Sequence, residues 1–115
     1  MLSSSDINNI INVIVKGYDP EKVYVFGSYA KGAAREDSDL DICVIKETTE
    51  RPLNRSVKIH SLFNPYPHAM DILVYTPEEF EERKKMINTM AYFIAKNSEL
   101  MYEKGVRAIS TESAK

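Results

Sequence analysis

Residues 27–41 read GSYAKGAAREDSDLD, and this stretch decides which fold and which chemistry to expect. It follows Val23-Tyr24-Val25-Phe26, a β-branched and aromatic run that is typical of a buried strand. Gly27-Ser28 ends that strand, and the alanine-rich segment 29–34 predicts a short helix after it. Glycine lets a backbone approach a ligand closely, and a helix N-terminus offers unpaired N–H groups to phosphate oxygens. The junction is therefore a candidate phosphate cradle, although an ordinary turn with a helix cap uses the same residues.

Two aspartates lie at the start of the next predicted strand, residues 39–45. Because side chains alternate along a strand, Asp39 and Asp41 share one face, with Cα atoms roughly 6.5–7 Å apart. Carboxylates at this spacing can share divalent cations, and Mg²⁺ is usually held by one or two carboxylates together with substrate phosphates. Solvated aspartates are the alternative, but aspartate is disfavoured in strands, and this pair leads directly into the apolar run 42–45. The pattern favours a metal site that a nucleotide completes.

Asp71 repeats the pattern, because it opens a third apolar run, Ile72-Leu73-Val74-Tyr75. If this strand lies beside the second one, three carboxylates converge on one edge of the sheet. Three acids that hold two metal ions about 3.5–4 Å apart are a known arrangement for in-line displacement at phosphorus. Lys31 and Arg35 lie between the cradle and the acids, so either could steady a triphosphate. Solvated basic residues are the alternative for both.

The rest of the chain predicts alternating helices and strands. Helices are expected over 4–17, 29–34, 50–63 and 77–96, and strands over 23–26, 39–45, 70–75 and 99–103. Ser4 or Ser5 can cap the first helix and Gly17 can end it, while the last helix could break near Asn88-Thr89. In the helix over 50–63, one face carries Leu53, Val57 and Ser61. The order α-β-α-β-α-β-α-(α)-β predicts an α/β fold in which helices flank a small mixed sheet.

Size and composition limit the possible classes of protein. The 115 residues fit one domain, expected over 1–104, with 105–115 as a loose polar tail. No apolar run approaches the ~20 residues of a membrane span, and no leader pattern opens the chain, so a cytoplasmic location is expected by default. A net charge of −2 without a Lys/Arg block makes nucleic acid an unlikely partner. A single cysteine, Cys43, excludes an intramolecular disulfide and is expected to fill the core.

Taken together, these motifs resemble the minimal nucleotidyltransferase branch of the DNA polymerase β-like nucleotidyltransferase superfamily. That branch is marked by Gly-Ser, ten residues, and then Asp-x-Asp, which Gly27-Ser28 and Asp39-Leu40-Asp41 match. A third aspartate followed by a helix start is also characteristic, and Asp71 is followed by Thr76-Pro77-Glu78-Glu79-Phe80. The resemblance runs from Val23 to about Tyr102 and implies the polymerase β-like nucleotidyltransferase fold.

The resemblance also implies a mechanism. Gly27 and Ser28 would hold the triphosphate of an NTP, expected to be ATP, with Lys31 and Arg35 as further nucleotide-binding candidates. The catalytic aspartates Asp39, Asp41 and Asp71 would bind two Mg²⁺ ions, one bridging the triphosphate and one near the acceptor. A nucleoside monophosphate, expected to be AMP, would move onto a hydroxyl group while pyrophosphate leaves.

The family context further suggests a partner. Minimal nucleotidyltransferases commonly act as antitoxins that adenylylate a tyrosine of a HEPN-domain RNase toxin. A small-molecule acceptor is an alternative within the same enzyme class, and the acceptor site would then come from a partner or a homo-oligomer. A non-catalytic nucleotide-binding module that occludes a toxin is the second hypothesis. A template-directed polymerase is poorly supported, because the chain has no basic groove for a duplex.

Overall fold

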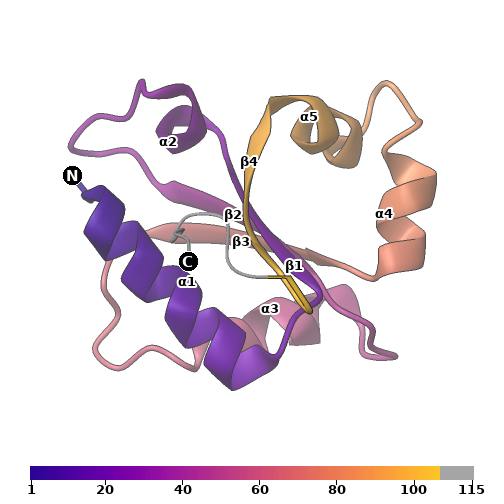
Figure 1. Ribbon diagram of the computed structural model, residues 1–115, viewed down its shortest axis with the longest axis horizontal. Coiled ribbons are helices and arrows are strands. Elements are labelled where there is room, and N and C mark those ends of the chain that lie inside the picture. The colour runs from indigo at the N-terminus through magenta and orange to yellow at the C-terminus, as the bar shows by residue number, and fades with distance from the viewer. Residues whose placement is uncertain (107–115) are drawn as a thin grey trace.

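The computed structural model of the chain describes residues 1–106. The elements are α1 (Ser4–Tyr18), β1 (Lys22–Phe26), α2 (Ser28–Lys31), β2 (Leu40–Ile45), α3 (Pro52–His60), β3 (Met70–Tyr75), α4 (Pro77–Arg83), α5 (Met90–Asn97) and β4 (Ser98–Glu103). This is the predicted order, with the break between α4 and α5 present (Figure 1). Most of the predicted tail, residues 107–115, lies outside the described residues. No helix within 1–106 is long and apolar enough to cross a membrane.

The four strands form one mixed sheet in the order β3-β2-β1-β4. β1 pairs antiparallel with both β2 and β4, whereas β2 and β3 run parallel. The predicted α/β class, with helices flanking a small mixed sheet, is therefore confirmed. Because β1 runs opposite to its neighbour, its C-terminal end meets the N-terminal ends of β2 and β3 at one edge. This edge brings the motif residues together.

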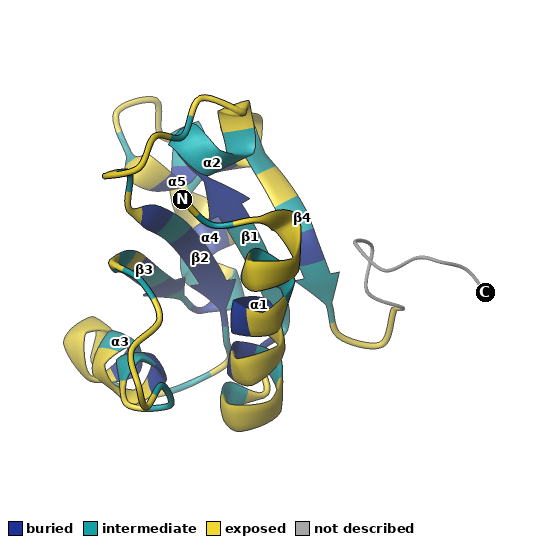
Figure 2. Ribbon diagram, turned by 90° about the vertical axis from the view of Figure 1, so that its left-hand side faces the viewer, coloured by how far each residue is buried: buried dark blue, intermediate teal, exposed yellow. Residues whose placement is uncertain are grey.

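Alternation along the strands builds two apolar layers. Ile42 and Val44 are fully buried on the face covered by α1 and α3. Cys43 and Ile45 are buried on the opposite face, where Phe80 of α4 and Ile94 of α5 pack against them. Figure 2 shows the buried strands enclosed between helices whose outer surfaces are exposed. Helices thus pack on both faces of the sheet, and polar groups can be exposed at the edge where the strand ends meet.

The boundaries of α1 differ from the prediction. Ser3, rather than Ser4 or Ser5, caps the helix through a reciprocal pair of hydrogen bonds with Asp6. The helix also continues through Gly17 and ends at Tyr18, with Asp19 in the left-handed conformation. A Cβ added to Gly17 would lie 2.7 Å from Leu62 Cδ2, so this glycine serves close packing between α1 and the end of α3.

The face of α3 that carries Leu53 and Val57 is turned to solvent. Leu53 and Val57 are 73% and 56% exposed, whereas Arg55 and Ile59 are buried. Each nitrogen of the Arg55 guanidinium has a hydrogen-bond acceptor. It donates to Glu50 O at 2.7 Å, to Val74 O at 3.2 Å and to both carboxylate oxygens of Glu79, at 2.8 and 3.2 Å. A buried charge can replace an apolar residue when it is paired and fully hydrogen-bonded in this way.

Candidate active site

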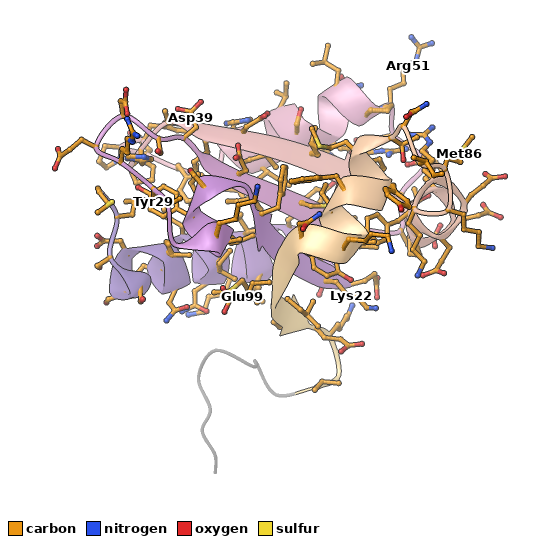
Figure 3. All side chains as sticks on the ribbon, turned by 90° about the horizontal axis from the view of Figure 1, so that it is seen from above. Lys22, Tyr29, Asp39, Arg51, Met86 and Glu99 are labelled. Atoms are coloured by element: carbon orange, nitrogen blue, oxygen red, sulfur yellow. The ribbon has the colours of Figure 1, made fainter. Side chains whose placement is uncertain are left out.

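Two of the three predicted acids meet across the parallel ladder. Asp41 is the second residue of β2 and Asp71 the second residue of β3, and the two are register partners. Asp39 directly precedes β2, so it belongs to the same edge. On the other side of β2, Asp41 is opposite Phe26, the last residue of β1, which leads directly into Gly27. Figure 3 shows Asp39 and Tyr29 at the end of the molecule opposite Met86.

The backbone at Gly27 lies directly against the Asp41 side chain. Gly27 has φ 74° and ψ −151°, a conformation that is essentially restricted to glycine. A Cβ at this position would lie 2.1 Å from Asp41 Oδ2, far inside van der Waals contact. The junction between β1 and α2 can therefore reach the carboxylate only because residue 27 has no side chain. The short helix α2 then runs from Ser28 to Lys31, with Gly32 as its C-cap, and so ends sooner than the predicted range 29–34.

Negative charge is concentrated at this edge. The pKa of Asp41 is raised, first by burial and then by the neighbouring charges of Asp71 and Asp39. Asp39 and Asp71 are exposed, while Asp41 is half-buried. Within residues 1–106, none of the three carboxylates takes part in an ion pair or a side-chain hydrogen bond. A cation placed here would relieve the repulsion and favour the charged form of Asp41.

The donor set suits one kind of metal in particular. Carboxylate oxygens are hard ligands, and Mg²⁺ takes one or two of them and fills its remaining positions with water and substrate phosphates. In the described part of the chain, no group of three or more His, Cys, Asp or Glu side chains is arranged to hold a metal on its own. Within this part of the chain, Asp39, Asp41 and Asp71 therefore do not by themselves form a metal site enclosed by protein ligands.

The two predicted basic residues are placed differently. Lys31 ends α2, and its Nζ lies 5.4 Å from the centroid of the Phe93 ring on α5. This cation–π contact holds the ammonium group against α5. Arg35 is exposed in the loop before β2, and only its backbone is anchored there, by hydrogen bonds with Ser38. The structure thus gives Lys31 a defined position, whereas the guanidinium of Arg35 has no ion-pair partner among residues 1–106.

Two further residues near the site, His68 and Tyr29, were not singled out from the sequence. His68 Nε2 lies 2.8 Å from the carbonyl oxygen of Ser38, the residue before Asp39. The Tyr29 ring packs edge-on against the His68 ring, with centroids 6.2 Å apart. Neither residue matches a ligand spacing, and the only available signal was that His68 closely precedes Asp71.

Cys43 is a core residue, as the sequence predicted. It is fully buried, and burial raises the pKa of its thiol to about 12. The thiol is therefore protonated at neutral pH and does not contribute to the chemistry of the acidic edge.

Comparison with known proteins agrees with this geometry. The sequence profile of the family described as "Polymerase beta, Nucleotidyltransferase" matches residues 8–106. A candidate nucleotidyltransferase from Sulfolobus solfataricus superposes with a TM-score of 0.60 at 19% identity, over 85% of this chain and 78% of that one. A toxin–antitoxin structure with AMP-PNP also gives 0.60, at 18% identity, over 85% and 73% of the two chains. A variant of the MntA–HpeT toxin–antitoxin pair gives 0.58 at 16% identity, over 85% and 73%. A comparison with curated proteins gives no match.

Proposed function

The chain belongs to the polymerase β nucleotidyltransferase family, and on that basis we propose that it transfers AMP from ATP onto a hydroxyl group. The observation that carries the proposal is the convergence of Asp41, Asp71 and the Gly27 backbone at one edge. Family membership gives the class of reaction, and this edge offers what the reaction needs. It combines unneutralised carboxylates for metal ions with an open backbone junction for phosphates.

Each motif residue has a role in the proposed reaction. Asp39, Asp41 and Asp71 would hold two Mg²⁺ ions, which supply positive charge to the triphosphate and to the attacking oxygen. Gly27 and Ser28 would hold the triphosphate against Asp41, and Lys31 would offset the charge that develops on the leaving group. Arg35 would contact the nucleotide from its loop.

The bond changes balance without a covalent intermediate on the protein. The hydroxyl oxygen of the acceptor forms a bond to the α-phosphorus while the bond from that phosphorus to the α,β-bridging oxygen breaks. Pyrophosphate departs with the electron pair of the broken bond, and Asp71, one of the two exposed aspartates at this edge, would take the hydroxyl proton. The protein contributes orientation and charge rather than a nucleophile.

We further propose that the acceptor is a tyrosine of a HEPN-type toxin and that the chain is the antitoxin of a cytoplasmic toxin–antitoxin pair. Two observations on structural neighbours support this. One neighbour is a toxin–antitoxin complex with AMP-PNP, and another is an MntA–HpeT variant in which two aspartates are replaced by glutamate. Asp39 and Asp71 are also exposed, so a macromolecular acceptor could reach the site directly.

Intact-mass spectrometry of the partner tests the proposal. The product of the neighbouring gene is purified and incubated with this chain, ATP and Mg²⁺. The proposal predicts a mass gain equal to one or more AMP groups, located on tyrosine by fragmentation. A stable complex whose components keep their masses would instead indicate neutralisation by occlusion. The control is the same incubation with EDTA, which should leave the mass of the partner unchanged.

A further inference from the structure

The loop that carries Asp39 is exposed, yet the structure fixes it on both sides of that residue. Before it, the Ser38 carbonyl oxygen is 2.8 Å from His68 Nε2. After it, the Leu40 N–H donates to the Ala69 carbonyl at 3.0 Å. Both partners come from the segment just before β3. Asp39 is therefore held between two hydrogen bonds to the segment that also delivers Asp71.

The two bonds differ in origin. The Leu40–Ala69 bond continues the parallel ladder and needs no particular side chain. The Ser38 bond depends on a side chain, because only the imidazole of His68 can supply it. A carbonyl oxygen only accepts, so Nε2 of His68 must carry the proton.

The orientation of His68 depends in turn on α2. The Tyr29 ring meets the His68 ring at 88°, an edge-to-face contact. Tyr29 directly follows Ser28 of the phosphate-cradle junction, and its hydroxyl accepts the Leu2 N–H at 3.0 Å. The chain of contacts therefore runs from α2 through Tyr29 and His68 to the residue before Asp39.

We propose that His68 is a positioning residue, which sets Asp39 relative to the junction 27–28 through its hydrogen bond to Ser38. The inference rests on the proposed function, because it assigns His68 to the assembly of the Mg²⁺–nucleotide site. Groups that orient metal ligands from behind typically change metal affinity 10–100-fold when they are removed. His68 acts on the ligand Asp39 through the backbone and does not touch substrate.

Two substitutions separate the hydrogen bond from the ring contact. His68→Gln keeps an N–H donor at about the reach of Nε2 but has no ring. His68→Phe keeps a ring against Tyr29 but cannot donate. His60→Phe is the matched control, because His60 ends α3 and contacts Tyr66 instead. Each variant is first checked for cooperative thermal unfolding.

The readout is Mn²⁺ affinity, measured by electron paramagnetic resonance in the presence of a non-hydrolysable ATP analogue. We expect His68→Phe to bind Mn²⁺ about tenfold more weakly than the wild type, in line with other groups that orient metal ligands. His68→Gln and His60→Phe should bind it nearly as tightly as the wild type. Unchanged Mn²⁺ binding by His68→Phe, or an equal loss of Mn²⁺ affinity in His68→Gln, would overturn the role assigned to His68 but not the proposed function. A wild-type chain that binds neither Mn²⁺ nor the analogue would overturn the proposed function as well.

A measurement on the wild-type chain covers the case in which His68→Phe does not fold. Long-range ¹H–¹⁵N correlation spectra distinguish a protonated Nε2 from a protonated Nδ1. The inference predicts a His68 imidazole with the proton on Nε2, and a neutral ring protonated only on Nδ1 would contradict it.

Discussion

At the scale of the single residue, Asp41 is subject to opposing demands. Its carboxylate is half-buried beside Asp39 and Asp71, and no cation pairs with it within residues 1–106. Burial and the two like charges raise its pKa, so in the absence of metal its charged form disfavours the folded state. Functional sites often keep a charged group that activity requires even though its charge destabilises the folded protein.

Asp41→Asn should therefore abolish transfer activity and slightly stabilise the metal-free protein. The pKa of Asp41 is higher in the folded protein than in the unfolded chain. The wild type is therefore destabilised relative to the variant as the pH rises above about 4. We expect the Tm of Asp41→Asn to exceed that of the wild type by a few degrees at most at pH 7. The difference should vanish below about pH 4, where Asp41 is protonated in both states. Calorimetric scans across pH check this, and a lower Tm for the variant at pH 7 would contradict it.

Gly27 and Gly32 provide a matched pair of substitutions. Both have positive φ, at 74° and 72°, but a Cβ on Gly27 would strike Asp41 Oδ2, whereas one on Gly32 meets nothing within 4 Å. Gly27→Ala should cost about 1–3 kcal/mol in unfolding free energy and eliminate nucleotide binding. Gly32→Ala should cost about 1 kcal/mol and leave binding intact. Urea unfolding and ATP-analogue titration measure the two effects, and equal binding losses in both variants would refute the role given to Gly27.

At the scale of the elements, an ion pair links α3 to α4. Arg55 on α3 and Glu79 on α4 form a two-pronged pair, and the Arg55 side chain is only 5% exposed. Glu79 also accepts the Thr76 N–H in the capping box of α4. Hydrogen bonding from Arg55 lowers the pKa of Glu79, so the charged pair stabilises the folded state.

Glu79→Gln should be strongly destabilising, because it leaves a buried guanidinium without its counter-charge. Removing one partner of a buried pair costs about 3–5 kcal/mol, and the partial exposure of Glu79 favours the lower end. The control Glu81→Gln breaks an exposed pair with Lys84 and should leave the unfolding free energy nearly unchanged. Guanidinium unfolding at pH 7 measures both. Because the Glu79 pKa is lowered, the difference between wild type and Glu79→Gln should shrink as pH falls below about 4.

The order of elements could be predicted from the sequence because each element carries local information. β3 was expected over its observed range, Met70–Tyr75, since its apolar residues lie between a proline loop and a capping box and only Asp71 interrupts them. The orientation of α3 could not be predicted in the same way. Leu53 and Val57 were expected on one face, but that face is exposed, and the buried position is occupied by Arg55, whose partners Val74 and Glu79 are distant in sequence.

The candidate site likewise has features that the sequence could predict and one that it could not. The spacing of Gly27-Ser28 and Asp39-Leu40-Asp41 was sufficient to select the motif, because its residues lie within one short stretch. The pairing of Asp41 with Asp71 was expected only if β3 lay beside β2, and it does. His68 could not be found, because its bond to Ser38 is a long-range contact that leaves no periodic signal.

At the scale of the whole molecule, a small domain presents its acidic edge openly. Asp39 and Asp71 are exposed, and the family profile spans nearly all of the described residues. The proposed protein acceptor could reach such an open site directly. The proposed chemistry can then be followed by tracing which phosphate of ATP is transferred to that acceptor.

Label transfer from ATP tests this central claim most directly. The chain is incubated with Mg²⁺, the partner protein and ATP labelled at either the α- or the γ-phosphate, with the Asp39→Asn/Asp41→Asn variant in parallel. The account predicts that the partner acquires label from the α-position only and that the double variant transfers none. Label from the γ-position would indicate kinase chemistry and contradict the mechanism, and undiminished transfer by the double variant would contradict the site.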